Sequence, residues 1–375
     1  MITVQPVHTR QEQRQFVDFP WRHYAGDSLW IPPLLVSIRE ALNYTPNPFY
    51  DQAAIQTFLA REGNRVVGRI AAIENRAHNQ RYHEERAFFG FYEAGEDPAI
   101  TAALLSAVRD WSRARGLRTL RGPVNPSLNY ELGLLVDGFH KPPAFMMSYN
   151  KPYYAARLES CGLAKSQDLY AFYGHVNMLG TLDKKLQSMV DAAKERFGVK
   201  LRALDKRRFL DEVRMFLDIY NRSLVNTWGF VPLSEGEVRH LAAGLKHLIV
   251  PELSIIAEIE GQPVGCCFAL LDYNPRIKQI NGRLFPFGFL RLLWNRRAIK
   301  QMRVISANVI PEYQRWGLGL VLLNGLVPKV MEWGIQEAEF SWVLESNHLS
   351  RASLEKGGAK LDKTYRLYDG LVDAD

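Results

Sequence analysis

The residues from Val309 to Gly319 have the types and spacing expected of a loop that binds a pyrophosphate. They include two glycines, Gly317 and Gly319, separated by a single residue. Glycine lets the backbone turn tightly, so several N–H groups can point at one anion. We therefore predict cofactor contacts from these residues: Val309, Gln314, Arg315, Trp316, Gly317, Leu318 and Gly319. The alternative interpretation is a tight turn without a ligand.

The flanking sequence predicts the elements that would hold this loop. Residues 303–309 are typical of a strand, and residues 320–333 are typical of a helix that ends at Gly334. The positive end of the helix dipole would then lie beneath the loop and favour an anion. The pattern Gln-x-x-Gly-x-Gly differs from the phosphate loop of nucleoside triphosphatases and from the dinucleotide fingerprint.

Several further elements follow in a recognisable order. A strand over 338–344 leads to Asn347, a helix over 350–356 ends at two glycines, and a strand over 363–368 follows. A hairpin precedes them, with strands over 253–259 and 264–271. Together with the loop, this order resembles the GCN5-related N-acetyltransferase (GNAT) superfamily. The resemblance implies acetyl-coenzyme A (acetyl-CoA) or a longer acyl-CoA as a cosubstrate, with no permanently bound cofactor, and an amine as the acceptor.

The resemblance also implies where amine acylation would take place. The amine must lose a proton, the thioester carbonyl must be polarised, and the leaving thiolate must be protonated. In GNAT proteins a backbone N–H near the end of the cofactor strand, here at residues 308–310, polarises the carbonyl. A Tyr seven residues after the Asn commonly protonates the thiolate, but this chain has Leu354 there. Tyr365 and Tyr368 are the candidate substitutes, or they simply pack in the core.

Three polar residues complete the candidate site. Glu345, which follows the strand over 338–344, is the candidate general base or amine anchor, against the alternative of a surface carboxylate. Asn347 is expected to bind the pantetheine arm of the coenzyme or to cap the following helix. Asn308 either points into the site or is a satisfied residue of an edge strand.

An internal repeat accounts for a chain twice as long as one such domain. Asp18 and Asp218 lie in similar sequences 200 residues apart, and Gly68 corresponds to Gly265. We predict an α/β (α+β) fold of two tandem GNAT-like domains, each a central mixed, mostly antiparallel sheet flanked by helices. The predicted division is a degenerate domain over 1–175, a linker over 176–200, and an acyl-CoA-binding domain over 201–375. In the first domain Gly95-Glu96-Asp97-Pro98 replaces the loop, and its two carboxylates would repel a pyrophosphate.

Composition favours a protein of the cytoplasm with a buried core in each half. Of the residues, 47% are hydrophobic, and the sequence has no apolar run long enough to span a membrane and no signal peptide. The three cysteines fit a reducing compartment, and the nine histidines lack the spacing of metal ligands, so we expect no metal site.

The segment 273–303 combines basic and aromatic residues without any Asp or Glu. It holds eight basic residues, although the whole chain has a net charge of only +7. One interpretation is peripheral contact of 283–303 with anionic lipid on the inner membrane face, beside a lipid substrate. The second is a core helix or domain cover with a solvated basic face. The third, nucleic-acid binding, is not expected because no groove-reading motif accompanies the charge.

A narrower resemblance involves three segments together: 281–288, 341–347 and 363–368. They are similar to a family of long bacterial tandem-GNAT proteins, some of which are linked to ceramide synthesis. The resemblance implies transfer of an acyl group to an amine, including a long-chain or sphingoid amine. The alternatives are acetylation of a small soluble amine, a catalytically inactive CoA-binding regulator, and aminoacyl or peptidyl transfer from tRNA.

Overall fold

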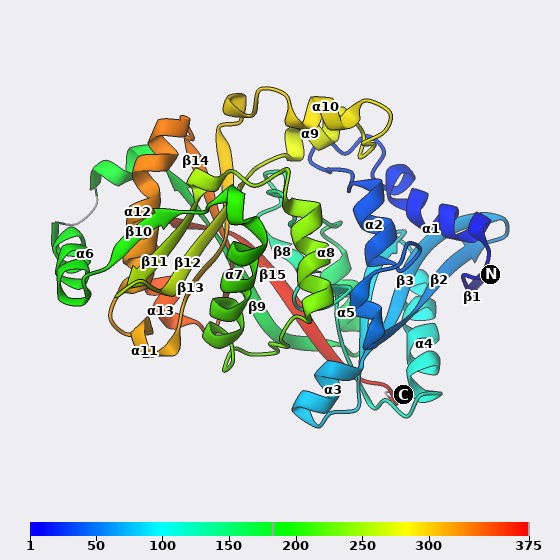
Figure 1. Cartoon of the computed structure of the whole chain (residues 1–375). Coiled ribbons are helices and arrows are strands. Elements are labelled where there is room, and N and C mark those ends of the chain that lie inside the picture. Colours follow the sequence, from blue (N-terminus) through cyan, green and yellow to red (C-terminus); the bar gives the residue numbers. More distant parts are fainter. Residues whose placement is uncertain (182–183, 374–375) are drawn as a thin grey trace. The chain divides into compact units, whose positions relative to one another are not determined.

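The chain forms two compact units in a computed structural model that describes residues 1–181 and 184–373 (Figure 1). The first unit consists of Met1–Asp168, Asn274–Leu292 and Thr364–Asp375, and the second of Leu169–Tyr273 and Leu293–Lys363. Each contains a sheet with helices against it, which confirms the predicted α/β fold.

The first unit is built on a sheet with the order β1-β2-β3-β4-β5-β15, in which residues 368–371 of β15 pair with β5 and residues 364–366 pair with β8. Only β4 and β5 are parallel along this path. The strands are β1 (Ile2–Pro6), β2 (Ala53–Glu62), β3 (Arg65–Asn75), β4 (Arg86–Ala94), β5 (Thr119–Gly122) and β8 (Leu134–Asp137), with β6 (Val124–Asn125) and β7 (Glu131–Leu132) in a separate hairpin. The helices are α1 (Arg10–His23), α2 (Leu35–Ala41), α3 (Arg76–Tyr82), α4 (Pro98–Arg113), α5 (Tyr154–Ser160), α9 (Asn274–Gln279) and α10 (Gly288–Leu293).

The second unit repeats this plan with the sheet order β10-β11-β12-β13-β14-β9. Again only one pair, β13 and β14, is parallel. The strands are β10 (Lys200–Ala203), β11 (Ser254–Ile259), β12 (Gln262–Leu271), β13 (Gln301–Val309), β14 (Glu337–Leu344) and β9 (Ala164–His175). The helices are α6 (Lys184–Phe197), α7 (Phe209–Ser223), α8 (Glu235–Leu245), α11 (Pro311–Gln314), α12 (Leu318–Trp333) and α13 (His348–Lys356), and β15 (Lys360–Leu371) follows them.

Strand register supports the internal repeat. Gly68 pairs with Ala94 in the first unit, and Gly265 pairs with Val309 in the second. Each glycine lies under a helix: a Cβ atom on Gly68 would lie 3.0 Å from a methyl group of Leu104 in α4, and one on Gly265 would lie 3.1 Å from a methyl group of Leu322 in α12. The equivalent helices therefore pack against equivalent strands.

The compact units differ from the predicted contiguous division because the last strand of each half completes the other sheet. Residues 364–371 pair with β5 and β8 in the first unit, and residues 169–175 pair with β14 in the second. The predicted linker over 176–200 contains the 3₁₀ turn Val176–Thr181 and α6, because Lys184–Phe197 is amphipathic and Val190 and Ala193 are buried beside Val321.

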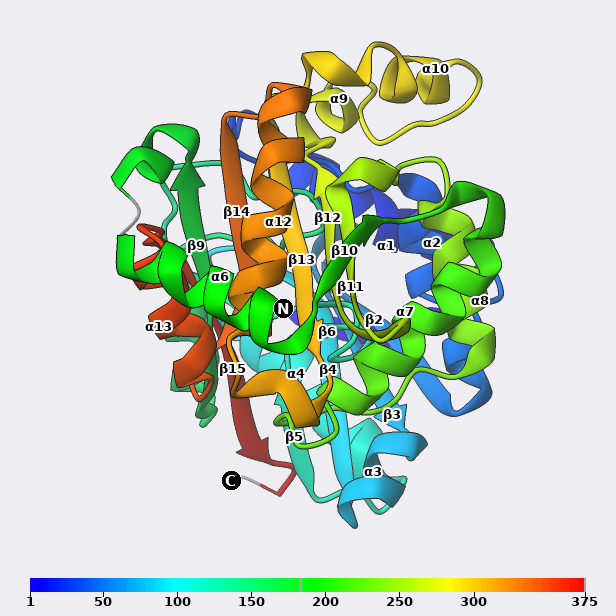
Figure 2. The ribbon, with the colours of Figure 1, turned by 60° about the vertical axis from the view of Figure 1, so that its left-hand side comes forward.

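Helices cover both faces of the second sheet (Figure 2). Gly265 of β12 faces α12, whereas Phe268, three residues along the strand, packs against Phe216 of α7 at 5.7 Å between ring centres. Side chains of a strand alternate between faces, so α12 and α7 lie on opposite sides of the sheet. Among the described residues, no helix is both long and apolar enough to cross a membrane.

Candidate active site

The predicted loop connects β13 to α12 through the short helix α11. Gly317 has φ +78° and begins α12, and Gly334 with φ +73° ends it. Among the described residues, the N–H groups of Gly317, Leu318 and Gly319 donate no backbone hydrogen bond. A Cβ atom built on Gly317 or Gly319 would have no atom within 4 Å. Unpaired N–H groups at a helix start, with open space above them, fit a pyrophosphate.

The side chains of the loop hold its shape. Gln314 donates from Nε2 to the carbonyl oxygens of Val309 at 2.9 Å and Ser223 at 3.1 Å, so it ties the turn to the end of α7. Leu318 is fully buried, and Arg315 is exposed. Trp316 is half-exposed, with the guanidinium carbon of Arg196 4.2 Å from its ring centre. The backbone at Gly317–Gly319, rather than these side chains, offers the anion contacts.

Strands β13 and β14 pair only over part of their length. The parallel register runs from Gln301 with Glu337 to Val304 with Phe340. After Val304, Ile305 lies in a bulge, because Phe268 pairs with Ser306 and Ala269 with Val304. Residues 305–309 therefore have β12 on one side and no register with β14 on the other. This unpaired strand edge leads directly to the anion-binding turn.

Asn308 is 7% exposed, and its Nδ2 atom has no hydrogen-bond partner among the described residues. The Oγ atom of Ser306, two residues earlier on the same face, is also buried and has no hydrogen-bond partner in the described part of the chain. Asn308 pairs with Cys266 and Ser306 with Phe268, so both side chains point to the α7 side of the sheet. Unpaired buried polar groups are costly and suggest a ligand there. The N–H of Ile310 is already used, donating to Val264 at 3.0 Å.

Glu345 and Asn347 lie together in the turn after β14. The carbonyl of Glu345 accepts from Arg351 at 3.3 Å, and the Arg351 guanidinium carbon lies 4.9 Å from the ring centre of Tyr170. Asn347 begins α13, and its Oδ1 accepts the Ser350 N–H at 3.1 Å. Its amide oxygen is thus used as a helix cap, the second of the two predicted roles.

Tyr365 and Tyr368 lie in the first unit, whereas the loop and Glu345 lie in the second. Both are fully buried, and Tyr368 belongs to the core around β4 and α4 while its hydroxyl donates to Glu159 at 3.1 Å. Burial raises the pKa of Tyr368. Leu354, at the position of the usual Tyr, packs with Phe172 and Val343.

The second unit contains a polar relay that was not predicted from the sequence. Arg303 Nε donates to Ser341 Oγ at 2.8 Å, and that hydroxyl donates to Glu339 Oε1 at 2.6 Å. Burial raises the pKa of the Glu339 carboxyl above its usual value. Arg303 pairs with Glu339 across β13 and β14, next to the point where the strands diverge. Each of the two predicted strands contains a single charged residue, Arg303 or Glu339, which gives no sign that the two belong to one relay.

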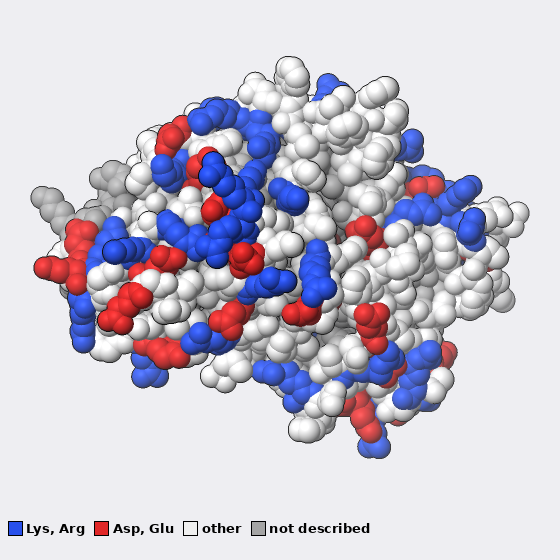
Figure 3. All heavy atoms as spheres, viewed as in Figure 1, with Lys and Arg blue, Asp and Glu red and all other residues white. Residues whose placement is uncertain are grey.

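Arg303 was expected on a basic membrane surface, and this expectation is wrong. Its side chain is 2% exposed and stacks 4.8 Å from the ring centre of Trp342. Arg296 and Arg297 donate to the carbonyls of His247 and Glu332, each at 3.2 Å. The aromatic residues of the segment do lie at the surface: Phe285 is 78% and Phe287 72% exposed. The surface over α9 and α10 is largely uncharged in Figure 3.

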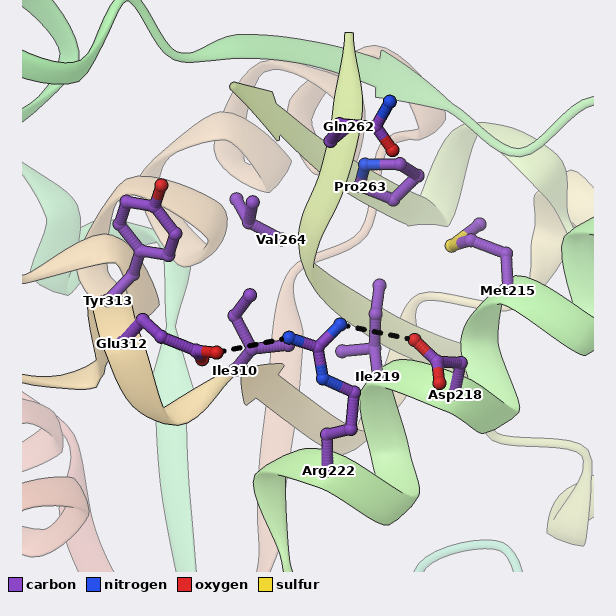
Figure 4. A pocket seen from close by; sticks show the side chains of 10 residues that line it. All are labelled: Met215, Asp218, Ile219, Arg222, Gln262, Pro263, Val264, Ile310, Glu312 and Tyr313. Atoms are coloured by element: carbon purple, nitrogen blue, oxygen red, sulfur yellow. Dashed lines mark hydrogen bonds and ion pairs between the residues drawn. The ribbon is translucent and has the colours of Figure 1, made fainter. Parts of the chain in front are cut away.

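A cavity of about 460 Å³ lies beside the loop on the α7 side of the sheet (Figure 4). Arg222 bridges Asp218 at 3.4 Å and Glu312 at 3.2 Å across it. The charged side chains of the lining, two carboxylates and one guanidinium, therefore sum to −1. Ile310 and Val264 also line the cavity, and Asn308 precedes Ile310 by two residues on the same strand face.

Relatives exist over nearly the whole chain, although no family model matches it. Protein YghO of Escherichia coli (strain K12) is 34% identical over 369 residues, which is 97% of this chain and 94% of that protein. The bacterial ceramide synthase of Caulobacter vibrioides (strain NA1000 / CB15N) is 36% identical over 375 residues, 98% of this chain and 97% of that protein.

Solved structures share the fold at low sequence identity. A tandem GNAT protein from the clavulanic acid biosynthesis pathway has a TM-score of 0.60 and 12% identity, with both chains fully covered. A GCN5-related N-acetyltransferase from Sphaerobacter thermophilus has a TM-score of 0.52 and 12% identity, over 99% of this chain and 96% of that one. With its two repeated units and its full-length relatives, this chain belongs to the bacterial tandem-GNAT acyltransferase family that includes the Caulobacter protein.

Proposed function

We propose that this protein transfers an acyl group from an acyl-CoA thioester to a long-chain amine, such as a sphingoid base. The observation that carries the proposal is the run of N–H groups at Gly317–Gly319 that find no backbone acceptor among the described residues. They follow a strand that has no register with β14 from Ile305 onward in the same part of the chain. A pyrophosphate at the turn would place the pantetheine arm along that edge. The name of the Caulobacter relative supports an acceptor of this class.

Charge assigns the two sides of the loop to the two substrates. The helix start at Gly317 favours an anion, whereas the cavity at Asp218 and Glu312 has a net negative lining and favours a cation. A protonated amine suits the second environment. We infer that the coenzyme binds at the turn and that the amine head group enters from the α7 side, toward Asn308.

The reaction needs one base that takes a proton from the acceptor amine. The ammonium gives one proton to the base, its nitrogen forms a C–N bond with the thioester carbonyl carbon, and the C–S bond breaks. The second proton lost from the nitrogen balances the one that the departing thiolate takes up. Glu345 remains the proposed base or amine anchor. Glu339 is the competing carboxylate, because a raised pKa suits an acid–base group.

Purified protein with palmitoyl-CoA and sphinganine tests the proposal, with the N-acyl product measured by mass spectrometry. A product that forms only with both substrates supports it. Acetylation of a small soluble amine in preference to the long-chain amine would instead favour the small-molecule acetyltransferase. Coenzyme binding without any turnover would favour the regulator.

Paired variants distinguish the two carboxylates. If Glu345 takes the proton, Glu345→Gln lowers kcat by roughly 10²–10⁴-fold while coenzyme affinity remains normal, and Glu339→Gln has a smaller effect. The opposite order would transfer the role to Glu339. Unchanged kcat in Glu345→Gln would leave that residue as a surface carboxylate.

We also propose that the protein contacts an anionic membrane. We expect exposed apolar side chains to contribute more to this binding than basic side chains do. Phe285, Phe287 and Leu290 are exposed in the first unit, and insertion of such side chains adds to electrostatic attraction. We expect binding to anionic vesicles that weakens as salt rises. Phe285→Ser with Phe287→Ser should reduce vesicle binding more than Arg296→Gln with Arg297→Gln. Absence of binding by the native protein would reject the contact.

A further inference from the structure

A second cavity in the coenzyme-binding unit is mainly apolar. It has a volume of about 150 Å³ and lies between α12, β14 and α13. Among the described residues, its lining contains no Lys or Arg to pair with a phosphate. Its volume is close to that of an engineered apolar cavity that accepts benzene, a hydrocarbon of six carbons.

The floor of the cavity is open because two of its three central residues are small. Met302, Ala338 and Gly174 lie opposite one another on the neighbouring strands β13, β14 and β9. A Cβ atom on Gly174 would approach Cε2 of Phe340 to 3.1 Å, so a larger residue would close this part of the floor. The space is thus built into the sheet by Gly174 and Ala338.

The roof and one wall are also apolar. Leu320, Leu323, Val327 and Val330 of α12 recur at the spacing of one helix face and line the roof. Leu354 of α13, at the place of the usual GNAT tyrosine, lines a wall. A hydroxyl there would face carbon atoms, so the departure from the GNAT pattern fits an apolar ligand.

Two residues of the cavity lining adjoin the proposed coenzyme contacts along the chain or the strand. Phe340, one of its lining residues, is the last residue of β14 in register with β13, and Leu320 directly follows Gly319. We propose that this cavity receives the hydrocarbon chain of the acyl donor, which makes the enzyme selective for acyl groups longer than acetyl. The inference rests on the proposed use of an acyl-CoA.

Calorimetric binding of CoA, acetyl-CoA and hexanoyl-CoA tests the cavity apart from turnover. Each buried methylene raises affinity about fourfold, so hexanoyl-CoA should bind the native protein at least about tenfold more tightly than acetyl-CoA. Ala338→Phe fills the cavity from the floor, and Val327→Trp fills it from the roof. Either substitution should abolish the gain from chain length while CoA still binds.

Met331→Trp is the matched control, since Met331 lies one turn beyond Val327 on α12, is 54% exposed and does not line the cavity. It should retain the tenfold gain. Thermal unfolding selects the folded variants, and one folded cavity variant is sufficient because each blocks the space alone. Equal affinity of native protein for acetyl-CoA and hexanoyl-CoA, or an undiminished gain in a folded cavity variant, overturns the inference. Failure of native protein to bind even CoA overturns the donor proposal itself.

Discussion

The two units use the same strand-to-helix turn in opposite ways. In the first, Pro98 at the start of α4 has no N–H to offer, and Asp97 accepts the N–H of Ala99 at 2.9 Å. In the second, Gly317 begins α12 and the following N–H groups remain unpaired among the described residues. The start of α4 is thus capped by the carboxylate of Asp97, whereas the start of α12 can bind an anionic ligand.

The strands that lead to these turns, β4 and β13, also differ in whether an equivalent polar side chain is hydrogen-bonded within the protein. Register places Glu93 and Asn308 at equivalent positions, one residue before Ala94 and Val309. Glu93 accepts hydrogen bonds from Tyr24 at 2.6 Å and Tyr154 at 2.8 Å, while the Asn308 amide nitrogen has no partner in the described part of the chain. The Glu93 carboxylate is therefore hydrogen-bonded within the protein, whereas the Asn308 amide nitrogen is available to a ligand.

The largest expected difference between the turns is in coenzyme binding. Gly319→Val should weaken CoA binding by more than about 100-fold, because the side chain would occupy the space above the N–H groups. The fold should tolerate it, since a Cβ there meets no atom within 4 Å. Gly95→Ala in the first unit should leave affinity unchanged. Two coenzyme sites per chain by calorimetry, or normal affinity in Gly319→Val, would contradict the assignment.

The free energy of unfolding should depend more on the first unit's strand residue, Glu93, than on its counterpart in the second unit, Asn308. Glu93→Ala should lower the free energy of unfolding by about 3–5 kcal/mol, because it leaves two buried tyrosine hydroxyls without their acceptor and Arg69, 3.8 Å away, without its carboxylate. Asn308→Ala should cost about 1 kcal/mol or less, since Nδ2 makes no hydrogen bond to any described residue. Denaturant titration measures both, and equal losses would remove the distinction.

The pH dependence sharpens this contrast. Burial raises the pKa of Glu93 to about 7, from 4.5. Between these values the unfolded chain has lost the proton that the folded chain keeps, so this group lowers stability as pH rises to about 7. Glu93→Gln should therefore gain about 2–3 kcal/mol relative to native protein between pH 4.5 and 7.

His23, which is hydrogen-bonded to Tyr154, contributes in the other direction. Burial lowers its pKa to about 4, so its contribution is lost as pH falls from 6.5 toward 4. This contribution is common to native protein and Glu93→Gln and cancels in their difference. Asn308→Ala should shift stability equally at every pH, because an amide does not titrate. A flat difference for Glu93→Gln between pH 4.5 and 7 would refute the raised pKa.

The smallest effect concerns the internal cap of α4. Asp97→Ala removes the acceptor for the Ala99 N–H and should cost about 1 kcal/mol of stability. The variant should still bind no coenzyme through the first unit, because Pro98 and the buried strand β4 remain. Appearance of a second coenzyme site in Asp97→Ala would show that the cap alone distinguishes the two turns.

Local patterns predicted the elements well and their assembly less well. The strand and helix around Gly317 were predicted because glycine spacing and hydrophobic periodicity are local signals. The burial of Arg303 was not, because a basic residue in a predicted strand gives no sign of the Ser341 and Trp342 side chains that surround it. The placement of Tyr365 and Tyr368 in the first unit depends on strand pairing far along the chain, which no local pattern contains.

The last strand of each half of the chain pairs in the sheet of the other unit, and this arrangement has a consequence during synthesis. The first sheet needs residues 364–371 beside β5 and β8, yet β8 ends at Asp137. A ribosome adding about 5–20 residues per second takes roughly 10–50 s to cover that interval. Throughout it the nascent chain presents an open strand edge, the kind of surface on which chains join one another. Slow translation or early termination should therefore favour aggregation of the nascent chain over release of a folded first unit.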